Sequence, residues 1–241
     1  MLISGKNSIT EALNGNTSIN KIQIVKNGKG FEHIVELALA KKVRFEFVDK
    51  SVLDRQSPLN QGVIADVIDF EYCEVSDILA LAEEKKQSPF VLILDGIEDP
   101  HNFGAIIRSA ECAGVHGIVI SKHRAVPVNE TVVKTSAGAV SNMKIARVTN
   151  VNQAIDYLKE NNVWVYGAES AGESIYKTDL IGSIAIVIGS EGQGISRLTL
   201  EKCDGIISLP LFGKVNSLNA SVACGITLYE VVRQNSIKKE K

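Results

Sequence analysis

From Phe90 onward, short apolar segments alternate with segments of helical period. The first of them, FVLILDG, is continuously apolar, which is typical of a strand buried on both faces of a parallel sheet. Five further candidate strands follow, and they are GIVIS, KIARV, VWVYGAE, IAIVIGS and GIISLP. The segments between them are NFGAIIRSAECAG, ETVVKTSAGAV, VNQAIDYLKENN and SRLTLEKC, and a long helix from Ser217 ends the chain. This alternation predicts an α/β fold with a doubly wound parallel sheet and helices on both faces.

A smaller α/β unit is expected before this domain. KIQIVK, RFEFV and GVIADVIDF have the pattern of strands, and NSITEALNG, FEHIVELALAKK and SVLDRQS have that of helices. VSDILALAEEKKQ then suggests a polar-faced connecting helix. The predicted organisation is a small α/β unit over residues 1–70, a linker helix over 71–88 and the main domain over 89–241.

Bulk charge does not identify a nucleic-acid-binding protein, because the net charge is −2 and the pI about 6.1. The charges are nevertheless uneven. Residues 1–66 carry nine Lys/Arg against seven Asp/Glu, whereas residues 69–90 carry two against six. On charge alone, a solvated surface with chance asymmetry explains this better than a binding face does.

Several classes of protein are disfavoured by composition. No apolar run approaches the roughly 20 residues of a membrane span, and MLISGKNS lacks the pattern of a signal peptide, so a cytoplasmic protein is expected. The four cysteines are scattered without a CxxC pair, as in reduced cytosolic proteins. The four histidines have no metal-ligand spacing, so no metal is expected.

The first loop of interest follows FVLIL. Ligands of open α/β sheets bind beyond the carboxyl ends of the strands, and here that segment reads DGIEDPHNFGAIIRSAECAG. Asn102 is a suitable helix cap, and Arg108 lies among small apolar residues of the helix. A guanidinium there needs a carboxylate, a phosphate or water. A structural salt bridge to Glu98 or Asp99 is an equally good interpretation.

Two further strands end in polar, glycine-rich loops. GSEGQGIS has the order GxxGxG, and Glu191 stands where a dinucleotide-binding fingerprint needs glycine, so it would repel a pyrophosphate. A cationic or hydroxyl-bearing ligand, or merely a tight turn, fits better. In LFGKVNSLNASVA, Ser217 is expected to cap the last helix with Asn219 in its first turn. Together with Asn216, these are more polar groups than a cap needs.

The order and spacing of the three loops resemble the motifs of the SpoU/TrmH branch of the SPOUT superfamily. These are RNA ribose 2′-O-methyltransferases that use S-adenosylmethionine. The resembling segments are DPHNFGAIIRSAECAG, IVIGSEGQGIS and ISLPLFGKVNSLNASVACG, with KTSAGA as a further family segment. The N-terminal unit resembles the ribosomal-protein-like substrate-binding domain of the branch that modifies large-subunit ribosomal RNA. Asn60 stands where that domain usually has a histidine.

The resemblance implies a Rossmann-like sheet with a deep trefoil knot, one of the rare exceptions to unknotted connections. The knot would draw the loops at 189–194, 207–211 and 214–219 into one pocket. The implied cofactor-binding residues are Gly189, Ser190, Gly194, Ile207, Leu209 and Leu218. The implied catalytic residues are Asn102, Arg108, Glu191, Ser217 and Asn219.

The expected reaction is methyl transfer from S-adenosylmethionine to a ribose 2′-hydroxyl in 23S ribosomal RNA, with guanosine as the first choice. Arg108 is a poor base because its pKa exceeds about 12, so it is expected to hold a phosphate and stabilise the developing 2′-alkoxide. Glu191 or a water would accept the proton. The residues expected to grip RNA phosphates are Lys21, Lys26, Lys41, Lys42 and Arg44.

The resemblance further implies a homodimer whose active sites contain residues of both chains. A tRNA substrate is the nearest alternative. A non-catalytic RNA-binding assembly factor is the alternative from another class, and it would not need Arg108 and Glu191 together. A nucleotide-dependent oxidoreductase is disfavoured by Glu191 in the broken fingerprint.

Overall fold

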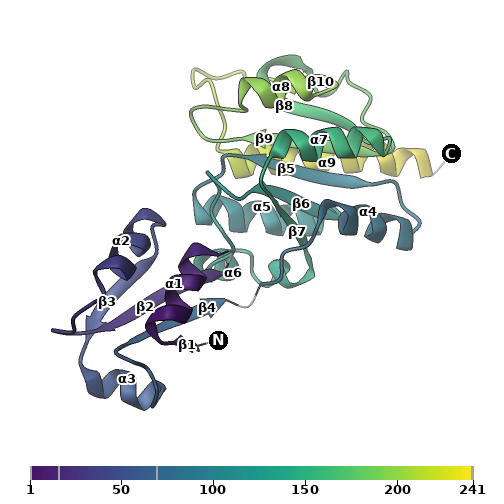
Figure 1. The fold of residues 1–241 in the computed structure, drawn as a ribbon. Helices are drawn as coiled ribbons and strands as arrows, with labels where there is room; N and C mark the ends of the chain where they lie inside the picture. Colours follow the sequence, from purple (N-terminus) through teal and green to yellow (C-terminus); the bar gives the residue numbers. More distant parts are fainter. Residues whose placement is uncertain (1, 16, 69, 240–241) are drawn as a thin grey trace. The chain divides into compact units, whose positions relative to one another are not determined.

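The computed structural model describes residues 2–15, 17–68 and 70–239 of the 241-residue chain. The chain divides into two compact units, Met1–Glu71 with Pro127–Glu130 and Tyr72–Val126 with Thr131–Lys241 (Figure 1). Each unit has its own sheet. Among the helices of the described residues, none combines the length and hydropathy of a membrane span.

The first unit is built on a four-stranded sheet in the order β1-β4-β2-β3. Only β2 and β3 run parallel, while β4 is antiparallel to both β1 and β2. Ile22 and Ile24 of β2 are fully buried in the core, as strand alternation requires. The strands are β1 (Leu2–Ser4), β2 (Ser18–Val25), β3 (Arg44–Val48) and β4 (Val63–Ile68), and the helices are α1 (Lys6–Asn14), α2 (Glu32–Ala40) and α3 (Lys50–Gln56).

The second unit contains the predicted doubly wound sheet. Its six strands are all parallel, in the order β10-β8-β9-β5-β6-β7, and each corresponds to a predicted strand. Every residue of β5 is buried, which explains why its residues 90–94 are all apolar. The strands are β5 (Phe90–Asp95), β6 (Gly117–Ser121), β7 (Lys144–Val148), β8 (Trp164–Ser174), β9 (Ile184–Gly189) and β10 (Gly205–Ser208).

Helices cover both faces of this sheet. Ile78 of α4 and Ile155 and Leu158 of α7 pack in one core cluster with Val91 and Ile93 of β5. Helices α5 and α9 pack against each other, and none of their described buried residues belongs to this cluster. The helices are α4 (Val75–Glu84), α5 (Pro100–Cys112), α6 (Glu130–Thr135), α7 (Val151–Glu160), α8 (Arg197–Lys202) and α9 (Ala220–Lys239), with a 3-10 turn η1 (Ala139–Asn142).

The segment expected to be a linker, residues 71–88, contains α4. Its Ile78 is fully buried and lies directly over Gly117 of β6, where a Cβ atom would overlap the isoleucine side chain. The start of the segment also joins this sheet, because the Cys73 amide donates to the Ile145 carbonyl at 2.9 Å. By its contacts, α4 is part of the second unit.

The last helix begins later than predicted. It starts at Ala220, and Ser217 lies outside it, so the expectation of a Ser217 cap is wrong. The reason is Asn219, whose Oδ1 accepts hydrogen bonds from the Ser221 amide at 2.9 Å and the Val222 amide at 3.3 Å. These bonds satisfy first-turn N–H groups, and residues 209–219 remain irregular.

A buried histidine next to β5 predicts a pH dependence of stability. His116 is 3% exposed, its Nδ1 accepts from the Phe90 amide at 3.0 Å, and its Nε2 lies 3.0 Å from Gln87 Oε1. Nε2 must then carry the proton, and the ring is neutral. Burial, assisted by the positive charge of Lys85, lowers the pKa of His116 below its usual 6.5.

The unfolded chain therefore takes up a proton at His116 before the folded chain does. The neutral ring's contribution to the free energy of unfolding is fully present above about pH 6.5. This contribution is lost as the pH falls towards the lowered pKa of His116 in the folded chain. We expect the free energy of unfolding in urea to decrease more steeply between pH 7.5 and 5.5 in the wild type than in His116→Gln, with the exposed His123→Gln as control. Equal slopes in the wild type and His116→Gln would refute this.

Candidate active site

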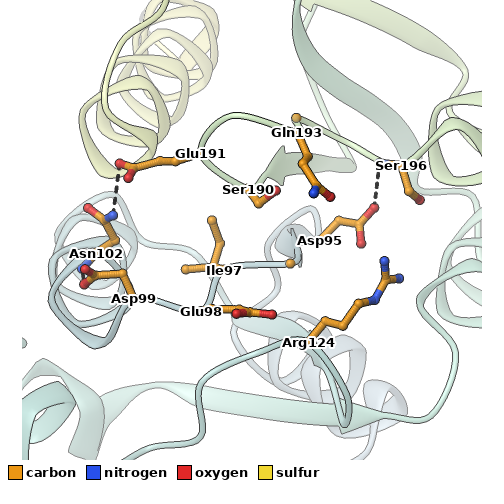
Figure 2. Close-up of a pocket in the computed structure, with 12 residues that line it drawn as sticks. Asp95, Ile97, Glu98, Asp99, Asn102, Arg124, Ser190, Glu191, Gln193 and Ser196 are labelled. Atoms are coloured by element: carbon orange, nitrogen blue, oxygen red, sulfur yellow. Dashed lines mark hydrogen bonds between the residues drawn. The ribbon is translucent and has the colours of Figure 1, made fainter.

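A polar network joins the ends of three chain segments at the carboxyl edge of the second sheet. Asn102 Nδ2 donates to Glu191 Oε1 at 3.0 Å (Figure 2). Asn219 Nδ2 donates to the same oxygen at 2.6 Å. Asn219 Nδ2 also lies 2.9 Å from Asn102 Oδ1. Glu191 Oε2 has no hydrogen-bond partner among the described residues, and Glu191 is exposed. The network thus holds one carboxylate oxygen and leaves the other open.

The sheet topology explains why these distant residues meet. Strands β5 and β9 are neighbours, and Asp95 at the end of β5 pairs with Gly189 at the end of β9. After β5 the chain adds β6 and β7 on one side of β5, and it then adds β8, β9 and β10 on the other side. The order therefore reverses between β5 and β9, and α/β folds bind ligands at such a switch point. Asn102 follows β5, and Glu191 follows β9.

The first turn of α5 frees Asn102 for the network. Asp99, not Asn102, caps the helix, because its carboxylate accepts from the His101 amide at 2.6 Å and the Asn102 amide at 3.0 Å. Pro100 occupies the first helical turn, where its missing N–H costs nothing. The Asn102 side chain can then reach Glu191.

A tight turn after β9 projects Glu191. Ser190 and Gly194 exchange two backbone hydrogen bonds of 3.1 and 3.0 Å, and a Cβ atom on Gly189 would overlap the backbone at Gly194. Glu169 in β8 secures the turn, since its Oε1 accepts from the Ile195 amide at 2.6 Å. The sequence interpretation missed Glu169, although an acid near the end of the apolar segment VWVYGAE was a usable signal.

A cavity of about 620 Å³ opens beside the network, within the size range of small-molecule sites. Its walls come from the loops after β9 and β10 and from the start of α9. The backbone N–H and C=O groups of Leu209 and Leu218 make no hydrogen bond among the described residues. The wall includes all six residues assigned to the cofactor, which are Gly189, Ser190, Gly194, Ile207, Leu209 and Leu218, and also Glu191, Ser217 and Asn219.

A second cavity of about 320 Å³ adjoins the first and shares Ser190, Glu191, Gln193 and Gly194 with it. Figure 2 shows residues that line this smaller cavity. It extends to Asn102 and to the end of β5. Among the described residues, no group of three or more His, Cys, Asp or Glu side chains is placed to hold a metal ion.

Arg108 is not brought into this site within one chain. It is exposed on α5 and lines neither cavity. Among the described residues it forms no ion pair, so the expected alternative of a salt bridge to Glu98 or Asp99 is wrong.

The five basic residues that were predicted to bind RNA phosphates occupy two places in the first unit. Lys21 and Arg44 are cross-strand partners on β2 and β3, and Lys41 and Lys42 form the turn that leads into β3. Lys26 lies beyond the opposite end of β2, 3.4 Å from Asp49. Lys21 is already paired with Glu46 at 2.7 Å. The cluster at the start of β3 therefore contains four of the five residues.

Comparison with known families gives two matches that together cover most of the chain. Residues 89–229 match the SpoU rRNA Methylase family. Residues 2–73 match the family described as RNA 2′-O ribose methyltransferase substrate binding.

Relatives and solved structures agree with these matches. A protein of Bacillus subtilis named as a TrmH family tRNA/rRNA methyltransferase is 44% identical over 97% of this chain and 96% of its own length. A Staphylococcus aureus protein of the same description is 43% identical with the same coverage. The SpoU methyltransferase AviRb from Streptomyces viridochromogenes, solved with the cofactor AdoMet, has a TM-score of 0.65 at 23% identity, over 99% of this chain and 91% of that chain. The A. aeolicus TrmH/SpoU tRNA modifying enzyme has a TM-score of 0.58 at 27% identity, over 68% and 85%.

Proposed function

Because the chain belongs to the SpoU rRNA methylase family and is an RNA methyltransferase, we propose that it methylates the ribose 2′-hydroxyl of a guanosine in 23S ribosomal RNA. The observation that carries the proposal is the Asn102–Glu191–Asn219 network at the mouth of the 620 Å³ cavity. The ribose 2′-oxygen as acceptor is supported by the N-terminal match to a substrate-binding domain of RNA 2′-O ribose methyltransferases. We place the enzyme in the cytoplasm with its RNA.

S-adenosylmethionine is the methyl donor, and the residues of the larger cavity fit it. The apolar side chains of Ile207 and Leu218 suit the face of an adenine ring, and the unbonded backbone groups of Leu209 and Leu218 suit its polar edge. Glu191 and Glu169, which also line this cavity, suit a positively charged sulfonium. When bound, the cofactor supplies an electrophilic methyl group.

The residues of the network have separate roles in this proposal. Glu191 Oε1 is fixed by the two asparagine amides, so its free Oε2 can accept the 2′-hydroxyl proton and pass it to solvent. Asn102 and Asn219 orient the carboxylate, and Ser217 at the cavity wall can bind the ribose. Holding donor and acceptor in line supplies much of the catalysis. The trefoil knot stays a prediction from the resemblance.

We further propose that the enzyme is a homodimer and that Arg108 acts in the partner's active site. Val222, Ile226 and Tyr229 repeat along one face of α9 and are 49%, 40% and 52% exposed. Gly225 of α9 faces Ser109 of α5, so this apolar face lies close to Arg108. Exposed apolar patches of this kind mark protein interfaces. Such a dimer would give Arg108 the partner that it lacks within one chain.

The apolar face gives a direct prediction about mass. By light scattering, the wild type should have twice the chain mass of 26.0 kDa, and Ile226→Glu should shift towards 26.0 kDa, because a charge cannot be buried unpaired in the interface. The control is Leu198→Glu, which alters an equally apolar, exposed side chain on α8. A wild type that is monomeric under conditions in which it is active would contradict the dimer.

The basic cluster at the start of β3 is proposed to grip RNA phosphates. The double variant Lys41→Ala/Arg44→Ala should bind RNA more weakly, and the slope of log Kd against log salt should fall by about 1 for each phosphate that is no longer bound. Lys50→Ala/Arg55→Ala on α3 removes the same charge from the same unit and serves as control. Equal salt slopes for the two double variants would place the RNA elsewhere.

The choice between ribosomal and transfer RNA is testable with labelled methyl groups. Wild-type protein is incubated with tritiated S-adenosylmethionine and either unmodified 23S ribosomal RNA or unmodified tRNA. Label in the 23S RNA alone supports the proposal, and label in tRNA alone supports the nearest alternative. If neither RNA is labelled although the cofactor still binds, the result contradicts both substrates and favours a non-catalytic RNA-binding protein. Such a protein would not need the Asn102–Glu191–Asn219 network.

A further inference from the structure

We propose that the 320 Å³ cavity binds the base of the target nucleotide and selects guanine. This inference rests on the proposed function, because it takes the Asn102–Glu191–Asn219 network as the place of the ribose. Both Asn102 and Glu191 line the 320 Å³ cavity as well as belonging to the network. The base is attached to the ribose carbon next to the one that bears the 2′-hydroxyl. A nucleotide with this hydroxyl at Glu191 therefore has its base within reach of the smaller cavity.

The floor of this cavity holds a buried carboxylate that is only half satisfied. Asp95 is 6% exposed, and its Oδ2 accepts from the Ser196 amide at 2.9 Å. Its Oδ1 has no hydrogen-bond partner among the described residues, and Figure 2 shows it directed away from Ser196 on the side where Arg124 lies. A buried carboxylate oxygen without a partner is costly, so a ligand that donates a hydrogen bond there is stabilised.

The same cavity also contains a positively charged hydrogen-bond donor. Arg124 lines it, is exposed, and forms no ion pair among the described residues. The Asp99 carboxylate also lines the cavity, but it is occupied in capping α5. The cavity thus offers an acceptor at Asp95 Oδ1 and a planar set of donors at Arg124.

Guanine is the base that matches this arrangement. Its N1–H and 2-amino group are adjacent donors, from either of which the open Asp95 Oδ1 can accept, and its O6 and N7 acceptors suit the Arg124 guanidinium. Adenine and cytosine offer a single amino donor beside a ring acceptor, and that acceptor would face a carboxylate. A phosphate is disfavoured by the carboxylates. A metal ion is not supported either, because the described residues form no group of ligands for one.

Asp95→Asn is the sharpest test, because it keeps the side-chain size and the oxygen that accepts from Ser196. It replaces the open oxygen with an amino group, which cannot accept from guanine. Arg124→Ala is the second variant. Asp156→Asn and Arg197→Ala are matched controls on α7 and α8, outside both cavities. Binding of 5′-GMP and 5′-AMP is measured by NMR titration with S-adenosylhomocysteine bound, and affinity for S-adenosylhomocysteine is measured separately.

The wild type and both controls should bind 5′-GMP more tightly than 5′-AMP. Asp95→Asn should weaken 5′-GMP binding about 10- to 100-fold, since a charged hydrogen bond is removed, and leave S-adenosylhomocysteine binding unchanged. Arg124→Ala should reduce the preference in the same direction, and it decides the matter if Asp95→Asn does not fold. The inference is overturned if the wild type binds 5′-GMP and 5′-AMP equally, or if the preference for 5′-GMP survives in both variants. The proposed function still stands in that case, provided that S-adenosylhomocysteine binds. A wild type that does not bind S-adenosylhomocysteine overturns both.

Discussion

Replacing Glu191 with glutamine is expected to lower kcat for methyl transfer by about 10²- to 10⁴-fold, the usual contribution of a positioned proton acceptor. The glutamine keeps an oxygen for the Asn102 and Asn219 amides, which now reach Glu191 Oε1 at 3.0 and 2.6 Å. It cannot take up the 2′-hydroxyl proton at the open position. Single-turnover kinetics with saturating RNA and S-adenosylmethionine isolate this step from binding.

Two comparisons make the Glu191→Gln result specific. S-adenosylhomocysteine affinity should change little, because most of the cofactor cavity is left intact. Glu201→Gln removes a carboxylate from the exposed surface of α8 and should retain full activity. If Glu191→Gln also kept its full rate, the proton would go directly to water, and the network would only position the ribose.

Arg108→Lys is expected to lose most of kcat, by about 10²-fold or more, while still binding the cofactor. A lysine keeps the charge but not the planar fork of donors that can hold a phosphate and the developing 2′-alkoxide together. Cofactor binding should survive, because Arg108 lines neither cavity of its own chain. A fully active Arg108→Lys enzyme would rule out the bidentate role.

A mixed dimer locates Arg108 in cis or in trans. Co-expression of an Arg108→Ala chain and a Glu191→Gln chain with different tags allows the heterodimer to be purified. If Arg108 serves the partner's site, one of the two sites is complete, and about half of the wild-type rate returns. An inactive heterodimer would place Arg108 in the site of its own chain, which then requires a movement of α5.

The strands could be predicted from the sequence where both of their faces are buried, because burial requires apolar side chains. Strands Phe90–Asp95 and Ile184–Gly189 lie in the middle of the sheet with both faces covered, so every position before the last residue of each strand is apolar. The three-residue strand Leu2–Ser4 at the edge of the small sheet was not expected, because it is too short for a period to show.

The exact beginnings of helices were harder to predict. Ser217 and Asn219 are both good caps by type, and the sequence offers no means of choosing between them. The structure selects Asn219, whose side-chain oxygen caps α9 while its amide group binds Glu191. The same competition in α5 gives the cap to Asp99 and leaves Asn102 for the network.

The spacing of residues in the sequence could not predict which side chains from different strands and loops come into contact. The resemblance named Asn102, Glu191 and Asn219, but their hydrogen bonds form because β5 and β9 are adjacent strands in the sheet. Asp95 and Arg124 were not singled out, because neither belongs to a motif with a recognisable spacing. The exposed position of Arg108 was also unexpected, and it is what makes a second subunit part of the proposed mechanism.

The central claim is that the methyl group goes to a ribose oxygen of 23S ribosomal RNA. The most direct measurement uses S-adenosylmethionine with a trideuterated methyl group, unmodified 23S RNA, and wild-type protein beside Arg108→Ala. The RNA is then digested to nucleosides and analysed by mass spectrometry, in which fragmentation separates the sugar from the base. We predict a mass increase on the ribose of guanosine, with wild-type protein only. A label on the base, or on no nucleoside of 23S RNA although tRNA becomes labelled, would contradict the account.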